Sequence, residues 1–156
     1  MTSERKKELL RILKFFLFSV SAGLIQIASF SLFNELLNDF WGYWPSYLIS
    51  LLLSIIWNFT FNRNFTFKSA SNVPLAMMLV LLFYAVFTPL STLMGEYLTG
   101  IGWNEYLVLA ITMVLNLILE FLYQRFVVFR KTLDTNKLAA KEKAAQSASS
   151  DVDENK

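Results

Sequence analysis

Two matched groups of residues in this chain have the types and spacing needed to bind a phosphate. Each holds a polar amide or acid, an arginine and two phenylalanines: Trp57-Asn58-Phe59, Arg63 and Phe67-Lys68 in the first, and Glu120-Phe121, Arg125 and Phe129-Arg130 in the second. The offset is constant, because 121 − 59, 125 − 63 and 129 − 67 all equal 62. This pattern favours phosphate binding over covalent chemistry.

The phosphate site is expected at Arg63 and Arg125, because a guanidinium group can bind phosphate oxygens bidentately whereas an ammonium acts as a point charge. Two such arginines from symmetric hairpins could converge on one phosphate. Lys14 is expected to add to this anionic site, and Arg11 could widen it. The alternative is that these basic residues only anchor helix ends at the membrane surface.

Polar residues recur every four positions in two of the apolar segments, so that each set shares one helix face. The sets are Ser50, Ser54, Asn58 and Asn62, and then Thr112, Asn116, Glu120 and Gln124. The serines and threonines are expected to join helices by hydrogen bonds. Binding or passage of a polar head group and helix joining both stay open for the larger polar residues: Gln26, Asn58, Asn62, Asn116, Glu120 and Gln124.

Glu120 is the one carboxylate predicted inside a membrane span away from its outer end. An unpaired charge there is unfavourable, so Arg125 or Arg63 is the expected partner. Either a structural ion pair or a role in coupling protons or substrate would explain the residue. The chain has no histidine and no cysteine. We therefore expect no metal site, no cofactor and no catalytic residue.

The composition places the chain in a membrane, since 55% of its 156 residues are hydrophobic and only 17% are charged. Four apolar segments can each form a helix that crosses or nearly crosses a bilayer. They cover residues 12–33, 47–61, 75–98 and 106–128, and the second is expected to borrow Phe65 and Phe67. Pro45 and Pro74 are predicted at helix starts, and Pro89 is predicted to kink the third helix.

The basic residues precede the first segment or follow the second and fourth, which places both termini in the cytoplasm. The other two loops hold acids and the interfacial aromatic residues Trp41, Tyr43, Trp44, Trp103 and Tyr106. Each repeat has two spans, so both copies enter the membrane the same way round. The predicted fold is an all-α membrane protein with four transmembrane helices, built as two parallel repeated two-helix hairpins.

Three regions are expected along the chain. Residues 1–11 form a basic cytoplasmic segment, residues 12–131 form the membrane domain with repeats at about 12–68 and 74–130, and residues 132–156 form a cytoplasmic tail. The tail has no aromatic residues and is rich in Ala, Lys, Ser, Glu and Asp, so we expect it to be disordered.

The motifs resemble the GtrA-like family of small bacterial four-span membrane proteins, over residues 10–131. The resemblance rests on Trp57-Asn58-Phe59, Asn62-Arg63 and Phe65-Thr66-Phe67, with a weaker echo at Glu120-Phe121, Gln124-Arg125 and Val128-Phe129. Leu119 and Glu120 depart from the pattern, since the first copy has Trp57 and Asn58 there.

The resemblance implies that the chain flips a polyprenyl-phosphate-linked sugar from the cytoplasmic to the outer leaflet of the bacterial cytoplasmic membrane. There, membrane glycosyltransferases would use it to modify O-antigen, teichoic acid or arabinogalactan. The sequence has no recognisable catalytic constellation, so we expect no enzymatic activity, and we expect no nucleic-acid partner. A lipid-open groove or a homo-oligomer is expected, because four helices enclose little volume. The alternatives are a scaffold that recruits such a glycosyltransferase without moving lipid, and a small multidrug exporter, although that class typically needs an acid where this first segment has Gln26.

Overall fold

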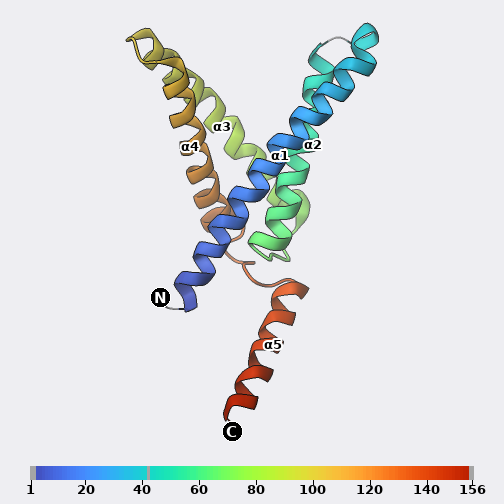
Figure 1. Cartoon of the computed structure of the whole chain (residues 1–156), viewed down its shortest axis with the longest axis vertical. Coiled ribbons are helices and arrows are strands. Elements are labelled where there is room, and N and C mark those ends of the chain that lie inside the picture. Colours follow the sequence, from blue (N-terminus) through green and yellow to red (C-terminus); the bar gives the residue numbers. More distant parts are fainter. Residues whose placement is uncertain (1–2, 42, 155–156) are drawn as a thin grey trace. The chain divides into compact units, whose positions relative to one another are not determined.

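The computed structural model describes residues 3–41 and 43–154, and all regular secondary structure in these ranges is helical (Figure 1). In chain order the elements are α1 (Ser3–Trp41), α2 (Tyr43–Phe61), the π-helix η1 (Asn62–Thr66), α3 (Val73–Gly100), α4 (Glu105–Tyr123), the π-helix η2 (Gln124–Val128) and α5 (Lys137–Glu154). Side chains of residues 37–44 lie outside this description, and with them the predicted interfacial roles of Trp41, Tyr43 and Trp44.

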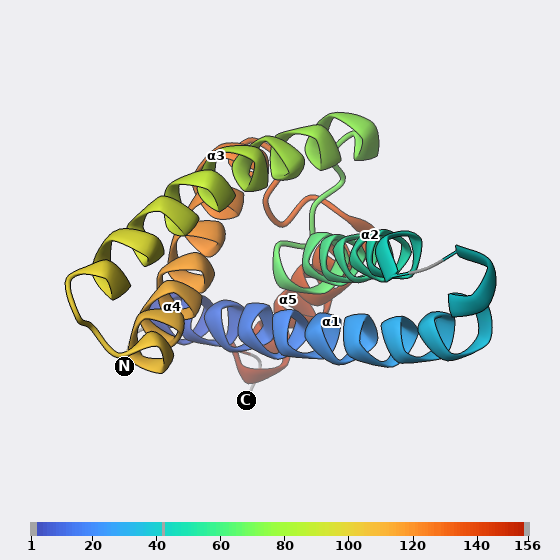
Figure 2. The same cartoon turned by 90° about the horizontal axis from the view of Figure 1, so that it is seen from above.

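The described residues divide into two compact units. The first unit contains the first hairpin, α1 with α2 and η1, together with the chain from Asp134 onward, including α5. The second unit, Ser71–Leu133, contains the second hairpin, α3 with α4 and η2. Helices α1 and α2 lie side by side in the view from above (Figure 2).

Three helical stretches of the described chain are long and apolar enough to cross a bilayer: Glu4–Leu36, Val73–Gly100 and Glu105–Val128. Their surfaces carry exposed leucine, isoleucine, valine and methionine side chains, as lipid contact requires. Helix α2 is not among them. Its 19 residues span about 28 Å at about 1.5 Å per residue, slightly less than a hydrocarbon core. These three helices indicate a multi-pass membrane protein.

Local sequence explains where the helices of the second unit start. The Asn72 side chain accepts a hydrogen bond from the backbone N–H of Leu75, and Pro74 occupies the first turn of α3, where its missing N–H is harmless. Asn104 caps α4 in the same way, accepting from Tyr106 and Leu107. Helix α3 continues on both sides of Pro89.

Aromatic side chains line the inside of each hairpin. In the first hairpin, the ring centroids of Trp57 and Phe61 on α2 are 4.4 Å apart, and those of Phe61 and Phe18 on α1 are 5.2 Å apart. In the second, Phe83 on α3 lies 5.3 Å from the Tyr123 ring on α4. The Phe18–Phe61 and Phe83–Tyr123 contacts tie the two helices of each hairpin together over the turns nearest the π-helices.

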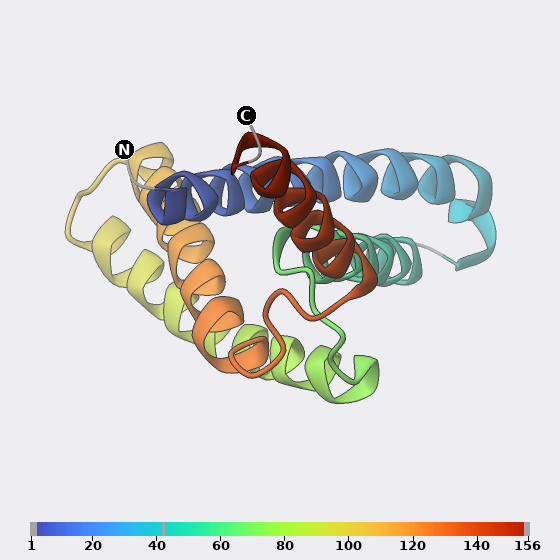
Figure 3. The same ribbon diagram turned by 90° about the horizontal axis from the view of Figure 1, so that it is seen from below.

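The tail was expected to be disordered, but residues 137–154 form the helix α5. Asn136 starts this helix by accepting a hydrogen bond from the backbone N–H of Ala139, whose side chain is buried. Ala, Lys and Glu are strong helix formers, so a segment without an apolar core of its own can still be helical. Figure 3 shows α5 from below.

Candidate functional site

Both hairpins end their second helix in a π-helix, at positions related by the same shift of 62 as the sequence motifs. The π-helix η1 runs from residue 62 to residue 66 and η2 from residue 124 to residue 128, so both ends differ by 62. In each, the backbone N–H of the following phenylalanine reaches a carbonyl five residues back at 2.9 Å: Phe67 to Asn62 and Phe129 to Gln124. Both phenylalanines are fully buried. Wide turns of this kind are frequent at functional sites.

The first polar row consists of Ser54, Asn58, Asn62 and Thr66, and all four residues are buried. The Asn62 amide nitrogen donates to the Asn58 side-chain oxygen at 2.7 Å, and the Thr66 hydroxyl donates to the Asn62 side-chain oxygen at 2.8 Å. Ser19 on α1 also donates to Asn58, at 3.3 Å. The amide oxygens of this row are therefore all engaged by donors within the first hairpin.

Further polar contacts join α1 to α2 in the first hairpin. The indole N–H of Trp57 donates to the Ser21 hydroxyl at 3.0 Å. Gln26 lies beside Ser54, whose hydroxyl is 3.4 Å from the Gln26 amide oxygen and 2.9 Å from the backbone oxygen of Leu51. The structure thus brings two predicted head-group residues of this hairpin, Gln26 and Asn58, into contacts between α1 and α2, and Asn62 bonds to Asn58 from η1.

The second polar row consists of Asn116, Glu120 and Gln124 on α4 and η2. Glu120 and Gln124 are buried, with exposed fractions of 2% and 1%. The Gln124 amide nitrogen donates to the Glu120 carboxylate at 2.9 Å, and the Tyr84 hydroxyl on α3 donates to the same carboxylate. These contacts are to neutral groups, and the pairing of Glu120 with an arginine stays a prediction.

Two side-chain oxygens of the second polar row lack a donor among the described residues. Asn116 Oδ1 and Gln124 Oε1 are both buried and have no hydrogen-bond partner in the described chain. They lie one helical turn to either side of Glu120. Buried amide oxygens are normally hydrogen-bonded, so two open acceptors on one helix face mark a place where a donor from outside the chain could bind.

The predicted phosphate-binding residues are partly exposed: Arg63 and Lys14 in the first unit, and Arg125 in the second. Each arginine directly follows the buried amide that opens its π-helix. Arg63 donates to the Asn64 side chain at 3.1 Å, and the Arg125 guanidinium lies 5.3 Å from the centre of the Phe126 ring. Their convergence on one phosphate stays a prediction.

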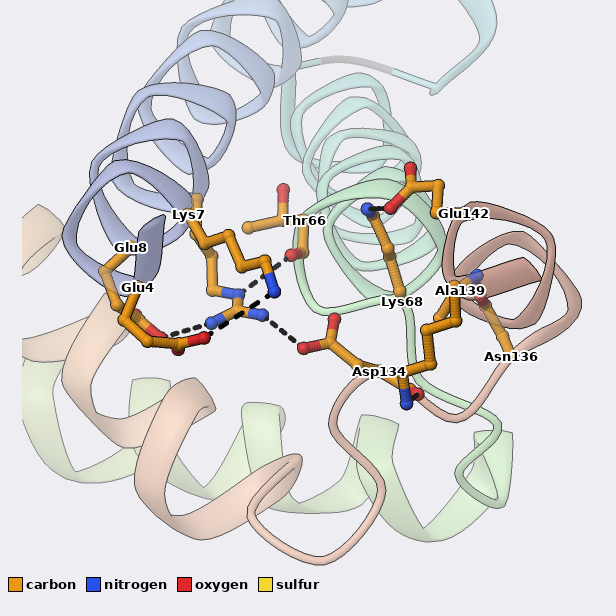
Figure 4. Close-up of polar contacts among 11 residues, drawn as sticks. Glu4, Lys7, Glu8, Thr66, Lys68, Asp134, Asn136, Ala139 and Glu142 are labelled. Carbon is orange, nitrogen blue, oxygen red and sulfur yellow. Dashed lines mark hydrogen bonds and ion pairs between the residues drawn. The ribbon is translucent and has the colours of Figure 1, made fainter. Parts of the chain in front are cut away.

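Arg11 has a structural role instead of widening the anionic site. Its side chain is buried and donates to the Thr66 backbone oxygen at 3.3 Å and to the Asp134 carboxylate at 2.7 Å, and it also pairs with Glu8. Figure 4 draws these contacts beside the Lys68–Glu142 ion pair, which joins α5 to the end of η1. Arg11 therefore ties α1 to η1 and to the segment that leads into α5.

The second unit has two grooves, whose lining residues the sequence did not specify. One, of about 500 Å³, lies between the first turns of α3 and the end of η2, and its lining includes Arg130 and Lys131. The other, of about 510 Å³, is lined by apolar and aromatic residues of α3 and α4: Leu82, Phe83, Val86, Phe87, Leu90, Leu119, Leu122 and Tyr123. Both volumes suit a ligand. Arg130 belongs to the second motif, where the shift of 62 aligns it with Lys68, but it was not among the predicted site residues.

No group of three or more acidic, histidine or cysteine residues in the described chain could hold a metal ion. The second unit by itself offers a partly exposed arginine, a buried polar row and an apolar groove, a combination suited to an amphiphilic ligand.

Comparison with known proteins identifies the family. The family model of the GtrA/DPMS transmembrane domain matches residues 14–129, a range that includes both polar rows and both arginines. No curated protein and no solved structure matches the chain. The chain belongs to the GtrA/DPMS transmembrane domain family.

Proposed function

We propose that this protein translocates a polyprenyl-phosphate-linked sugar across the bacterial cytoplasmic membrane, for glycosylation of cell-surface polysaccharides, without catalysing a covalent reaction. The observation that carries the proposal is the matched placement of an arginine beside a buried amide at the π-helix of each hairpin, in a chain of this membrane family. The arginine suits the phosphate, and the polar row suits the head group.

The proposed topology has four spans, with α2 and η1 together forming the second. Helix α2 has 19 residues and η1 has 5, and the two follow each other without a break. The second span can therefore extend beyond Phe61 to include Phe65, as the sequence predicts. Both hairpins enter the membrane the same way round, and both termini face the cytoplasm, because the basic residues lie at that side. Arg63 and Arg125 then lie at the cytoplasmic surface, where the lipid is loaded.

In the proposed complex, Arg63 and Arg125 hold the phosphate and Lys14 adds charge. The head group passes residues of the polar rows: Gln26, Asn58, Asn62, Asn116, Glu120 and Gln124. The isoprenoid chain stays in the bilayer, against apolar surfaces such as the α3–α4 groove of about 510 Å³. Only the polar head then needs shelter, which suits a small bundle, alone or as a homo-oligomer.

The proposal is tested by measuring leaflet exchange of labelled polyprenyl-phosphate hexose in proteoliposomes. The double variant Arg63→Ala, Arg125→Ala should lose exchange, because both phosphate ligands are gone. The matched control is Lys137→Ala, Lys141→Ala, which removes the same charge from exposed positions of α5 and should keep exchange. All three proteins must insert equally.

The scaffold alternative makes the opposite prediction. Correctly inserted wild-type protein would then give no exchange, even with lipid supplied on the cytoplasmic side, and would copurify with a glycosyltransferase. That outcome would contradict the translocation proposal, and equal exchange in the double variant and the control would contradict the role of the two arginines.

A further inference from the structure

The two polar rows differ in whether their acceptors are already used. In the first row, the Asn58 oxygen accepts from Asn62 and Ser19, and the Asn62 oxygen accepts from Thr66. This row is closed by donors that belong to the chain itself.

The Gln124 oxygen is open because an apolar residue replaces the donor that closes its counterpart. At the shift of 62, Gln124 stands where Asn62 stands, and Val128 stands where Thr66 stands. Val128 is buried and offers no hydroxyl to Gln124, whose side-chain oxygen has no hydrogen-bond partner in the described chain. The open acceptor thus follows directly from a residue exchange between the repeats.

The orientation of the Gln124 amide is fixed by its neighbour. Its nitrogen donates to the Glu120 carboxylate at 2.9 Å, and turning the amide round would place two oxygens against each other. The Gln124 oxygen must therefore point away from Glu120. One turn on the other side of Glu120, the Asn116 oxygen is likewise buried without a partner in the described chain.

We infer that the second polar row, and not the first, binds the hydroxyl groups of the sugar, through the open oxygens of Asn116 and Gln124. The inference rests on the proposed function and assigns recognition of the head group to one hairpin. The two acceptors are eight residues apart, or about 12 Å along the helix. That separation is too large for the shared ligand sphere of one metal ion, whose ligands lie about 2.3–2.6 Å away. It suits the several hydroxyl groups of a sugar.

The test compares the binding of polyprenyl phosphate and polyprenyl-phosphate hexose to the full chain in nanodiscs, measured by native mass spectrometry. Wild-type protein should prefer the glycosylated lipid about tenfold or more, because it adds hydrogen bonds to open acceptors. Val128→Thr supplies the hydroxyl that closes the Gln124 oxygen in the manner of the first row. It should lower the preference about fivefold and leave binding of the unglycosylated lipid unchanged.

Thr66→Val is the matched control, because it makes the reverse exchange in the first hairpin. It should lower the thermal stability and keep the preference for the glycosylated lipid. Asn116→Leu, which removes the other acceptor at similar volume, provides a second test if Val128→Thr does not fold, and it should also lower the preference.

The outcomes separate this inference from the proposed function. Equal wild-type binding of the two lipids would overturn the inference and leave lipid translocation standing. Wild-type protein that binds neither lipid would overturn both. A full preference retained in Val128→Thr and Asn116→Leu, or an equal loss in Thr66→Val, would overturn the assignment to the second hairpin.

Discussion

The first and second hairpins share a backbone feature, a π-helix at the end of the second helix, and differ in the polar residues that precede it. Each carries a π-helix, a buried amide at its start and a buried phenylalanine directly after it. The first polar row holds only neutral groups, which bond to one another and to α1. The second row holds a carboxylate and two open oxygens. Two hairpins with the same backbone feature thus differ in their acceptors: among the described residues of the two rows, only the second row holds side-chain oxygens without a donor.

The largest expected effect is on stability, and it tests whether the two polar rows differ in their hydrogen bonding. Asn62→Ala removes two side-chain hydrogen bonds, to Asn58 and from Thr66, and should lower the free energy of unfolding by about 2 kcal/mol. Gln124→Ala removes the one bond to Glu120 and should cost about 1 kcal/mol. Reversible unfolding in mixed detergent micelles measures both. Equal losses would mean that the second row is as fully bonded as the first.

The arginines provide the next comparison. Arg63→Lys and Arg125→Lys keep the charge and remove the bidentate fork, so lipid exchange should fall about tenfold in each, equivalent to about 1.4 kcal/mol. Proteoliposome exchange under identical lipid loading measures the effect. A loss confined to one variant would show that the hairpins divide the phosphate unequally, and full activity in both would favour simple membrane anchoring.

The smallest expected effect concerns the contact between α1 and the segment leading into α5. Arg11→Met removes the hydrogen bonds to Thr66 and Asp134, and should lower the free energy of unfolding by about 1 kcal/mol, since Asp134 and Glu8 are partly exposed and can be solvated. Limited proteolysis before α5 should become faster. Val73→Met, at the matching position of the second hairpin, is the control, and an equal response would contradict a role specific to Arg11.

Much of this architecture could be predicted from composition and spacing. The apolar segments and the helix start at Pro74 depend on local patterns, which the helices of each hairpin follow. The pairing of Gln124 with Glu120 was also within reach, because residues four apart share a helix face. These features need only one helix or one repeat at a time.

Other features depend on contacts or geometry that no local pattern encodes. Arg11 meets Asp134 across 123 positions of sequence, so its charge could not be assigned to structure in advance. The Tyr84 hydroxyl bonds to Glu120. The first hairpin has Ala22 at the matching position, so a comparison of the two motifs gives no sign of this bond. Low hydrophobicity predicts a disordered tail, but Ala, Lys and Glu have high helix propensity, and residues 137–154 are helical.

The π-helices also set the angular phase of everything that follows them. An α-helix turns about 100° per residue, so the additional residue in each wide turn rotates the chain beyond it by about that angle. Phe67 and Phe129 are thereby placed one wide turn beyond Asn62 and Gln124, where both are buried. Deleting one residue from either π-helix would remove this rotation and turn the buried phenylalanine toward another face. The spacing from amide to phenylalanine is therefore a register that tolerates substitution far better than a change in length.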